Sequence, residues 1–304
     1  MRFVYYSLAN FPHDSRERQW IQSIRSLRLH NATIPVWLLL FNGASDELLT
    51  EAKRCNVQLR LLGDYQEFLQ KVHLKASILA LYPTFHKFLV LGCLPLEEAT
   101  QILYLDCDTF FFGDVNLLFA RDEGQDWYAR EEFRSRRSPL GYDPNHVDEQ
   151  SLQSIARGEG LNHIQPFNSG VCLLNRNVWN KLESLHNRYL DTAWRLLCGR
   201  ELNRGNDNVR DQVVRQAVLD SITDLDRSRA LPYPSRNDWI IEQIALWLVL
   251  GQLPSLSVGN FSPTHVAQGG EFETMIRSNP RCIVAHYFTS GEKNFFAAVS
   301  PIAD

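Results

Sequence analysis

The strongest constraint on the fold is the alternation of short apolar runs with helical patterns in the first third of the chain. The apolar runs predict strands at Arg2–Leu8, Pro35–Phe41, Val57–Leu62 and Gln101–Leu105. Helices are expected between them, around Trp20–Leu27, over Ser45–Cys55 and Tyr65–Leu81, and from His86 onward. Runs that are apolar throughout are typical of strands covered on both faces. The pattern therefore predicts an α/β fold with a mainly parallel, mixed sheet flanked by helices.

The remainder of the chain is less regular. Residues Glu131–Gln165 are polar and rich in Arg, Pro and Gly, so we expect a long loop there. Beyond it we expect a strand at Val171–Leu174, helices over Val178–Cys198, Asn208–Leu219 and Asp238–Leu250, and short strands near Ser255–Val258 and Arg281–His286. No repeat or linker interrupts these elements. The sequence therefore predicts one domain over residues 1–304.

Composition argues against several classes of function. The chain has 31 Lys and Arg against 35 Asp and Glu, a formal net charge of −4. Proteins that bind nucleic acid are normally basic, so we expect no nucleic-acid partner. The longest apolar stretch, Val36–Phe41, is far shorter than the roughly 20 residues of a membrane span. Peripheral membrane contact stays open.

Cysteine usage and the N-terminus predict the compartment. The six cysteines are scattered without a C-x-x-C pair, which argues against a disulfide scaffold and a zinc ribbon. No apolar segment of the secretory type follows Met1. We therefore expect a cytoplasmic protein.

Two carboxylates follow the strand Ile102–Leu105 directly. In open α/β sheets, ligands bind beyond the carboxyl ends of the strands. Residues two apart on an extended chain point to the same side, so Asp106 and Asp108 can converge. Two ionised carboxylates repel each other unless a cation lies between them. A hard divalent ion, Mn²⁺ or Mg²⁺, is the cation that such oxygen ligands favour.

Other interpretations of this pair are possible. The acids could simply cap the strand end. Phosphatases of the haloacid dehalogenase type also place an aspartate after a strand, but they need Thr or Val two residues after the second acid, whereas Thr109 comes one residue after it. A nucleotidyltransferase should show a glycine-rich basic loop after the first strand, and Ser7–Pro12 is not of this kind.

Three stretches resemble family 8 glycosyltransferases, the group that includes glycogenin and bacterial lipopolysaccharide galactosyltransferases. Ile102–Phe119 is similar to the D-x-D segment, and Phe167–Asn175 is similar to the F-N-S-G strand. Ile283–Lys293 is similar to the C-terminal H-x-x-G-x-x-K motif, although Gly and Lys follow the His at offsets of five and seven instead of three and six. The resemblance extends over nearly the whole chain.

This resemblance implies a GT-A fold and transfer of a sugar from a nucleotide-diphosphate donor, most often a UDP-sugar. Residues to about 120 would then form the nucleotide-sugar-binding half, and residues from about 121 to 304 the acceptor and catalytic half. The metal ligands implied are Asp106, Asp108 and His286. The metal would be Mn²⁺ or Mg²⁺, held against the donor diphosphate.

Donor-binding residues follow from the same resemblance. Ser7 and Asn10 lie where base and ribose would bind, Lys87 is a phosphate or sugar contact, and Lys293 is a diphosphate contact. The remaining donor-side residues implied are Cys107, Ser169, Gly170 and Gly291. Asn168 belongs with the catalytic residues near the sugar.

The family also carries an acidic and amide pair beside the donor sugar. Asp211-Gln212 and Glu242-Gln243 both match, and we favour Glu242-Gln243 because it is the polar interruption of an otherwise apolar helix. Family 8 enzymes retain the anomeric configuration. We expect the front-face route, with Gln243 positioning the sugar, over a double displacement. A loop at Arg130–Pro139 is the expected acceptor-side element.

The acceptor stays open: a glycan, a lipid-linked sugar, a protein or a small molecule would all be compatible, and the oligomeric state is also open. A non-catalytic protein of the same fold that binds a nucleotide-sugar or a partner is the main alternative to the enzyme.

Overall fold

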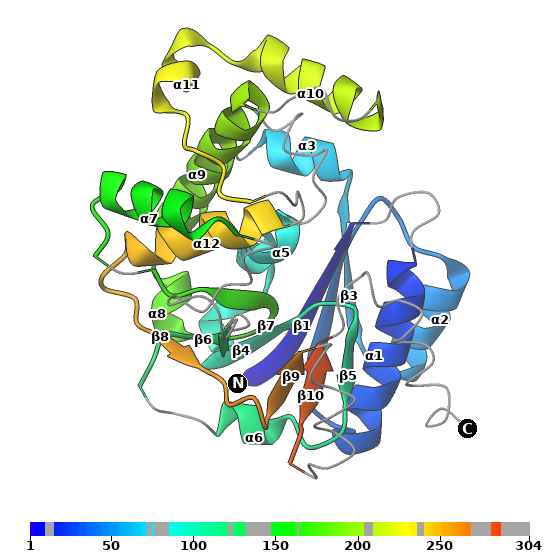
Figure 1. Cartoon of the computed structure of the whole chain (residues 1–304). Coiled ribbons are helices and arrows are strands. Elements are labelled where there is room, and N and C mark those ends of the chain that lie inside the picture. The colour runs from blue at the N-terminus through cyan, green and yellow to red at the C-terminus, as the bar shows by residue number, and fades with distance from the viewer. Residues whose placement is uncertain are drawn as a thin grey trace.

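The computed structural model describes residues 1–9, 15–71, 75, 85–120, 124–131, 147–162, 164–203, 209–235, 240–268 and 281–286, with the backbone alone for 209–214. Its centre is a seven-stranded sheet in the order β3-β2-β1-β4-β7-β6-β8. These strands are β1 (Arg2–Ala9), β2 (Val36–Phe41), β3 (Gln58–Gly63), β4 (Gln101–Leu105), β6 (Trp127–Glu131), β7 (Phe167–Asn175) and β8 (Val258–Asn260). A second, three-stranded sheet contains β5 (Thr109–Phe111), β10 (Val284–His286) and β9 (Val266–Gln268) (Figure 1).

The main sheet changes direction at β7. Strands β3, β2, β1 and β4 are parallel to one another, whereas β7 is antiparallel to both β4 and β6. The carboxyl end of β4 therefore meets the amino end of β7, where Leu105 pairs with Val171. The expected α/β fold with a mainly parallel, mixed sheet is confirmed.

Helices cover both faces of the sheet. The described α-helices are α1 (Arg16–His30), α2 (Asp46–Arg54), α3 (Tyr65–Gln70), α5 (His86–Leu89), α6 (Asn116–Phe119), α7 (Glu149–Gly158), α8 (Arg176–Trp179), α9 (Leu182–Asn203), α10 (Val209–Ser221), α11 (Asp224–Arg229) and α12 (Ile241–Gly251), of which α10 and α11 pack on α9. Alternate residues of β1 belong to different cores: Phe3 and Tyr5 pack with α5, α7, α9 and α12, while Val4 and Tyr6 pack with α1, α2 and the small sheet. Each face of the sheet thus has its own apolar layer, with helices on both sides (Figure 1).

The expected loop over Glu131–Gln165 is wrong for its second part, because Glu149–Gly158 forms α7. The Asp148 side chain caps this helix by accepting a hydrogen bond from the Ser151 amide at 3.0 Å. Leu152, Ile155 and Ala156 then face the core at helical spacing.

Two expected helices also differ from those observed. The helix expected over Tyr65–Leu81 corresponds to α3, which ends at Gln70; positions 72–74 and 76–81 of this expectation lie outside the described residues. The helix expected over Val178–Cys198 is divided into α8 and α9, with a break after Trp179. None of the described helices combines the length and apolar character needed to cross a bilayer, and all six cysteines are free thiols.

Candidate functional site

The candidate site begins where β4 ends. Asp106 leaves the strand, Cys107 and Asp108 form a turn, and the chain enters β5 at Thr109. The amide of Asp106 still donates to the carbonyl oxygen of Gly170 at 2.8 Å, so the first acid stays attached to β7. Because β5 pairs with β10 and Thr109 lies opposite His286, an imidazole from the C-terminal part of the chain reaches the two acids.

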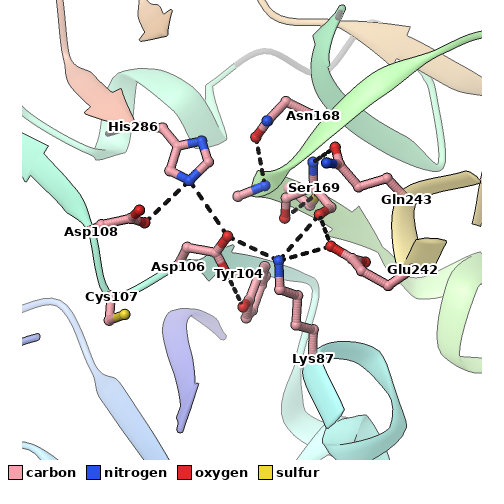
Figure 2. A network of polar contacts seen from close by, with 12 residues as sticks. Lys87, Tyr104, Asp106, Cys107, Asp108, Asn168, Ser169, Glu242, Gln243 and His286 are labelled. Carbon is pink, nitrogen blue, oxygen red and sulfur yellow. Dashed lines mark hydrogen bonds and ion pairs between the residues drawn. The ribbon is translucent and has the colours of Figure 1, made fainter. Parts of the chain in front are cut away.

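The three expected ligands lie together. Nε2 of His286 is 3.2 Å from Oδ1 of Asp108 and 3.5 Å from Oδ2 of Asp106. One ligand atom from each residue lies within 4.8 Å of the others. Asp108 and His286 are buried and Asp106 is partly buried. Figure 2 shows the three side chains pointing toward one another.

The charges at this place attract a cation. Burial alone would lower the pKa of His286, but the neighbouring carboxylates of Asp108 and Asp106 outweigh burial and raise it to about 10. Burial would likewise raise the pKa of Asp106, yet Lys87 and His286 hold it below its ordinary value. Two carboxylates and one imidazole are a donor set that suits a divalent metal ion, which competes with the proton for the imidazole nitrogen. The residues present therefore fit the implied metal.

A buried lysine links this triad to α12. Nζ of Lys87 donates to Oδ2 of Asp106 at 2.9 Å, to Oε1 of Glu242 at 3.0 Å and to Oγ of Ser169 at 3.3 Å. Burial would lower the pKa of Lys87, but the two carboxylates outweigh it and raise the pKa above its ordinary value. An ammonium group has three N–H donors, so these acceptors occupy all of them.

Glu242 and Gln243 reach the site from the first turn of α12. Oε1 of Glu242 also accepts from Oγ of Ser169 at 2.7 Å, and Oε1 of Gln243 accepts from the Ser169 amide at 3.1 Å. Oε2 of Glu242 is buried with no hydrogen-bond partner among the described residues. Burial raises the pKa of Glu242 despite the nearby Lys87. Glu242 is thus held in the site through its Oε1 atom.

The F-N-S-G segment forms a bulge that contacts both the imidazole of the triad and the buried lysine. The pairing of β6 with β7 jumps from Ala129 opposite Cys172 to Arg130 opposite Asn168, so the residues between have no partner on β6. Oδ1 of Asn168 accepts from the Gly170 amide at 2.8 Å and holds the bulge. Ser169 thereby faces Lys87 (Figure 2). Gly170 lies against the imidazole of His286. Bulges next to functional sites often redirect side chains in this way.

The sequence model of glycosyl transferase family 8 matches residues 17–197, well over half of the chain. The chain belongs to glycosyl transferase family 8. Membership supports glycosyl transfer as its activity and confirms the resemblance stated from the motifs. No curated protein sequence matches it.

Solved structures similar to this family 8 chain have the GT-A fold. The galactosyltransferase LgtC in complex with donor and acceptor sugar analogues is 13% identical, with a TM-score of 0.53 over 99% of this chain and 96% of LgtC. Mouse xyloside xylosyltransferase 1 in its apo form is 11% identical, with a TM-score of 0.50 over 95% of this chain and 99% of that protein. At such low identity the likeness establishes the fold, and the expected GT-A fold is confirmed.

Other expected donor contacts of this family 8 chain lie apart from the triad or outside the described residues. Oγ of Ser7 is hydrogen-bonded to Nδ1 of His86 at 2.7 Å, at the end of β1. The Cys107 thiol donates to Oε1 of Gln19 at 3.5 Å, toward α1. Asn10, Gly291 and Lys293 lie outside the described residues, as do positions 132–139 of the expected acceptor loop. The side chains of the alternative pair, Asp211 and Gln212, are also outside them.

Sequence reasoning missed two tyrosines of the site. The Tyr104 hydroxyl donates to Oδ1 of Asp106, and the Tyr5 hydroxyl donates to the Lys87 carbonyl oxygen at 3.0 Å. Tyr104 precedes Asp106 by two residues, and the alternation of side chains along β4 could have predicted that both face one side. Tyr104 thus holds the Asp106 carboxylate, and Tyr5 holds the backbone of Lys87.

Proposed function

We propose that this chain transfers a sugar from a nucleotide-diphosphate donor, a UDP-sugar, to an acceptor hydroxyl with the help of Mn²⁺ or Mg²⁺. Residues 1–304 would act as a single domain in this proposal. Asp106, Asp108 and His286 would hold the metal. The observation that carries the proposal is the convergence of their ligand atoms at the carboxyl end of β4. When bound, the metal would supply positive charge to the diphosphate as it leaves.

Lys87 would act by positioning its neighbours. All three of its N–H donors are occupied by Asp106, Glu242 and Ser169, which leaves none for a phosphate. It would therefore fix the first metal ligand relative to α12, in place of the expected direct contact with the donor. The remaining donor contacts, Ser7, Asn10, Cys107, Gly291 and Lys293, stay predictions.

Glu242 and Gln243 would meet the donor sugar. The unpartnered Oε2 of Glu242 would accept a hydrogen bond from a sugar hydroxyl, because a buried carboxylate oxygen without a partner is unfavourable. Gln243 would position the sugar beside Ser169, to which it is already hydrogen-bonded.

Transfer would proceed with retention by the front-face route. A double displacement would need a nucleophile on the opposite face of the sugar, whereas this proposal assigns Glu242 to a sugar hydroxyl. The acceptor oxygen would bond to the anomeric carbon on the face that the diphosphate leaves, as the bond to the diphosphate breaks. The acceptor proton would pass to a phosphate oxygen of the leaving group.

The test is donor hydrolysis, which needs no knowledge of the acceptor. The protein is incubated with radiolabelled UDP-, GDP- and dTDP-sugars and Mn²⁺, and release of free sugar and nucleoside diphosphate is measured. We expect slow, Mn²⁺-dependent release with UDP-sugars, lost in Asp108→Ala and unchanged in Glu97→Ala, which alters an exposed acid.

Other outcomes would point elsewhere. Binding of UDP with no release from any donor would favour the non-catalytic protein. Release of inorganic phosphate from a phosphate ester would favour a phosphatase, and pyrophosphate formation a nucleotidyltransferase. An equal rate in wild type and Asp108→Ala would refute the metal site. A cytoplasmic location also stays a prediction, supported by six free thiols.

A further inference from the structure

Helix α1 buries a polar stripe beside its apolar one. Gln19, Ser23 and Ser26 are each at most 1% exposed, at helical spacing. A polar side chain in a core is unfavourable unless it is hydrogen-bonded. The apolar neighbours of the stripe already attach the helix to the core, namely Trp20, Ile24 and Leu27. The polar stripe therefore calls for a separate explanation.

All three polar residues contact one segment, the turn of the two acids and the strand that follows. Gln19 accepts from the Cys107 thiol at 3.5 Å, and Oγ of Ser23 lies 2.9 Å from Oγ1 of Thr109. Oγ of Ser26 accepts from the amide of Phe111 at 3.0 Å. Three or four helical residues advance about 4.5–6 Å, close to the roughly 6.6 Å of two residues in a strand. Successive residues of the stripe therefore lie opposite alternate residues of the segment.

The hydroxyl groups in these contacts donate their hydrogen bonds in one direction. Oγ1 of Thr109 donates to the carbonyl oxygen of Asp106 at 2.8 Å. A hydroxyl has one proton to donate, so Thr109 must accept from Ser23. Ser23 in turn accepts from the Tyr6 hydroxyl, 2.9 Å away. The chain of donors runs from Tyr6 through Ser23 and Thr109 to the peptide group of the first acid.

The peptide groups of Asp106 are thus held on both sides, its carbonyl by Thr109 and its amide by Gly170. We propose that Ser23 and Thr109 are positioning residues that fix the turn of Asp106 and Asp108 so that it can bind the metal. This inference rests on the proposed function. Neither residue reaches the site itself, since both are fully buried behind the turn. Partners behind metal ligands raise metal affinity by reducing the freedom of the ligands.

The test compares Thr109→Val, which keeps the shape and removes the hydroxyl, with Thr109→Ser, which keeps the hydroxyl. Binding of Mn²⁺ in the presence of UDP is measured by electron paramagnetic resonance of the free ion. We expect Thr109→Val to bind Mn²⁺ about tenfold more weakly and Thr109→Ser to stay within about twofold of wild type. The KM for Mn²⁺ should rise in Thr109→Val, with kcat at saturating Mn²⁺ little changed.

Ile24→Val is the matched control, because Ile24 lies on the same buried helix but packs in the apolar stripe. It should lower the thermal stability and leave Mn²⁺ affinity unchanged. Should Thr109→Val fail to fold, Ser23→Ala tests the same chain of donors from the helix side.

Wild-type affinity in the folded variants that lack the hydroxyl, or equal weakening in Ile24→Val, would overturn the inference. Absence of Mn²⁺ binding in the wild type would instead refute the proposed function on which it rests.

Discussion

A β-carbon on Gly170 would lie 2.3 Å from Cε1 and 2.4 Å from Nε2 of His286. The imidazole therefore occupies the space that any side chain at position 170 would need. Since Nε2 is the atom that faces Asp106 and Asp108, a single glycine on β7 determines whether the third candidate ligand can reach the other two.

Gly170→Ala should therefore displace His286 from the acids. We expect Mn²⁺ binding at least about tenfold weaker than in the wild type, because one of three ligands is lost or moved. Isothermal titration calorimetry with Mn²⁺ measures this.

The matched control for that change is Gly158→Ala. Position 158 ends α7 and has open space where the methyl group would go. Its Mn²⁺ affinity should equal that of the wild type. If Gly170→Ala also binds Mn²⁺ normally, His286 is not a ligand.

Lys87→Met should destabilise the protein, because it removes the ammonium group that pairs with the buried Glu242 and the partly buried Asp106. Removing one partner of a buried ion pair lowers the free energy of unfolding by about 3 kcal/mol or more. Adding Glu242→Gln should recover about 1 kcal/mol of this loss, since one uncompensated charge disappears. Guanidinium unfolding of the single and double variants measures both values.

The second substitution, Glu242→Gln, should restore part of the stability lost in Lys87→Met but should not restore activity. The double variant should be inactive in the donor hydrolysis assay, because the proposed mechanism places Glu242 at the sugar. Lys53→Met, at an exposed position of α2, should match the wild type in both assays. Further loss of stability in the double variant would contradict the coupling between Lys87 and Glu242.

Glu51 joins α1 to α2 and makes stability depend on pH. Burial would raise its pKa, but hydrogen bonds from Arg25 and Arg54 outweigh burial and lower the pKa from 4.5 to about 2. As pH falls, the unfolded chain takes up this proton first, so the stabilisation is present above pH 4.5 and is lost as pH falls toward 2.

Glu51→Gln should lower the free energy of unfolding at pH 7 by about 1–2 kcal/mol, a modest value because both arginines are partly exposed. Urea unfolding between pH 7 and pH 2.5 should show this difference shrinking as pH falls. Glu47→Gln, on the exposed side of the same helix, should show little difference at either pH. A difference for Glu51→Gln that is independent of pH would contradict the assignment.

Strands β1, β2 and β4 could be predicted because each is buried on both faces and therefore apolar throughout. Strand β3 was also predicted, although it is largely exposed at the edge of the sheet, whereas the buried strand β6 was not. Gln101–Leu105 coincides with β4, and Arg2–Leu8 differs from β1 by one residue. Helix α7 was not predicted, because it has only three buried residues among mostly polar ones. Its helical periodicity is therefore hard to recognise in the sequence. The short strands β5 and β9 have three residues each, too few for a pattern to emerge.

The residues of the site that lie within a sequence motif could be predicted. Those that join the site through the pairing of distant segments could not be predicted from local sequence. The D-x-D and F-N-S-G motifs predicted which residues gather beyond β4. The pairing of β5 with β10, which brings His286 to Thr109, depends on tertiary structure and could be predicted only through the family resemblance. Lys87 likewise gains its role from Glu242, far along the chain.

In the proposed enzyme, Asp106, Asp108 and His286 hold one divalent cation against a donor diphosphate. Crystals grown with Mn²⁺ and UDP and measured at the manganese absorption edge would locate this cation. We expect one anomalous peak within about 2.0–2.4 Å of a carboxylate oxygen of each acid and of Nε2 of His286, with the diphosphate as a further ligand. Bound UDP without such a peak, or a peak elsewhere, would contradict it.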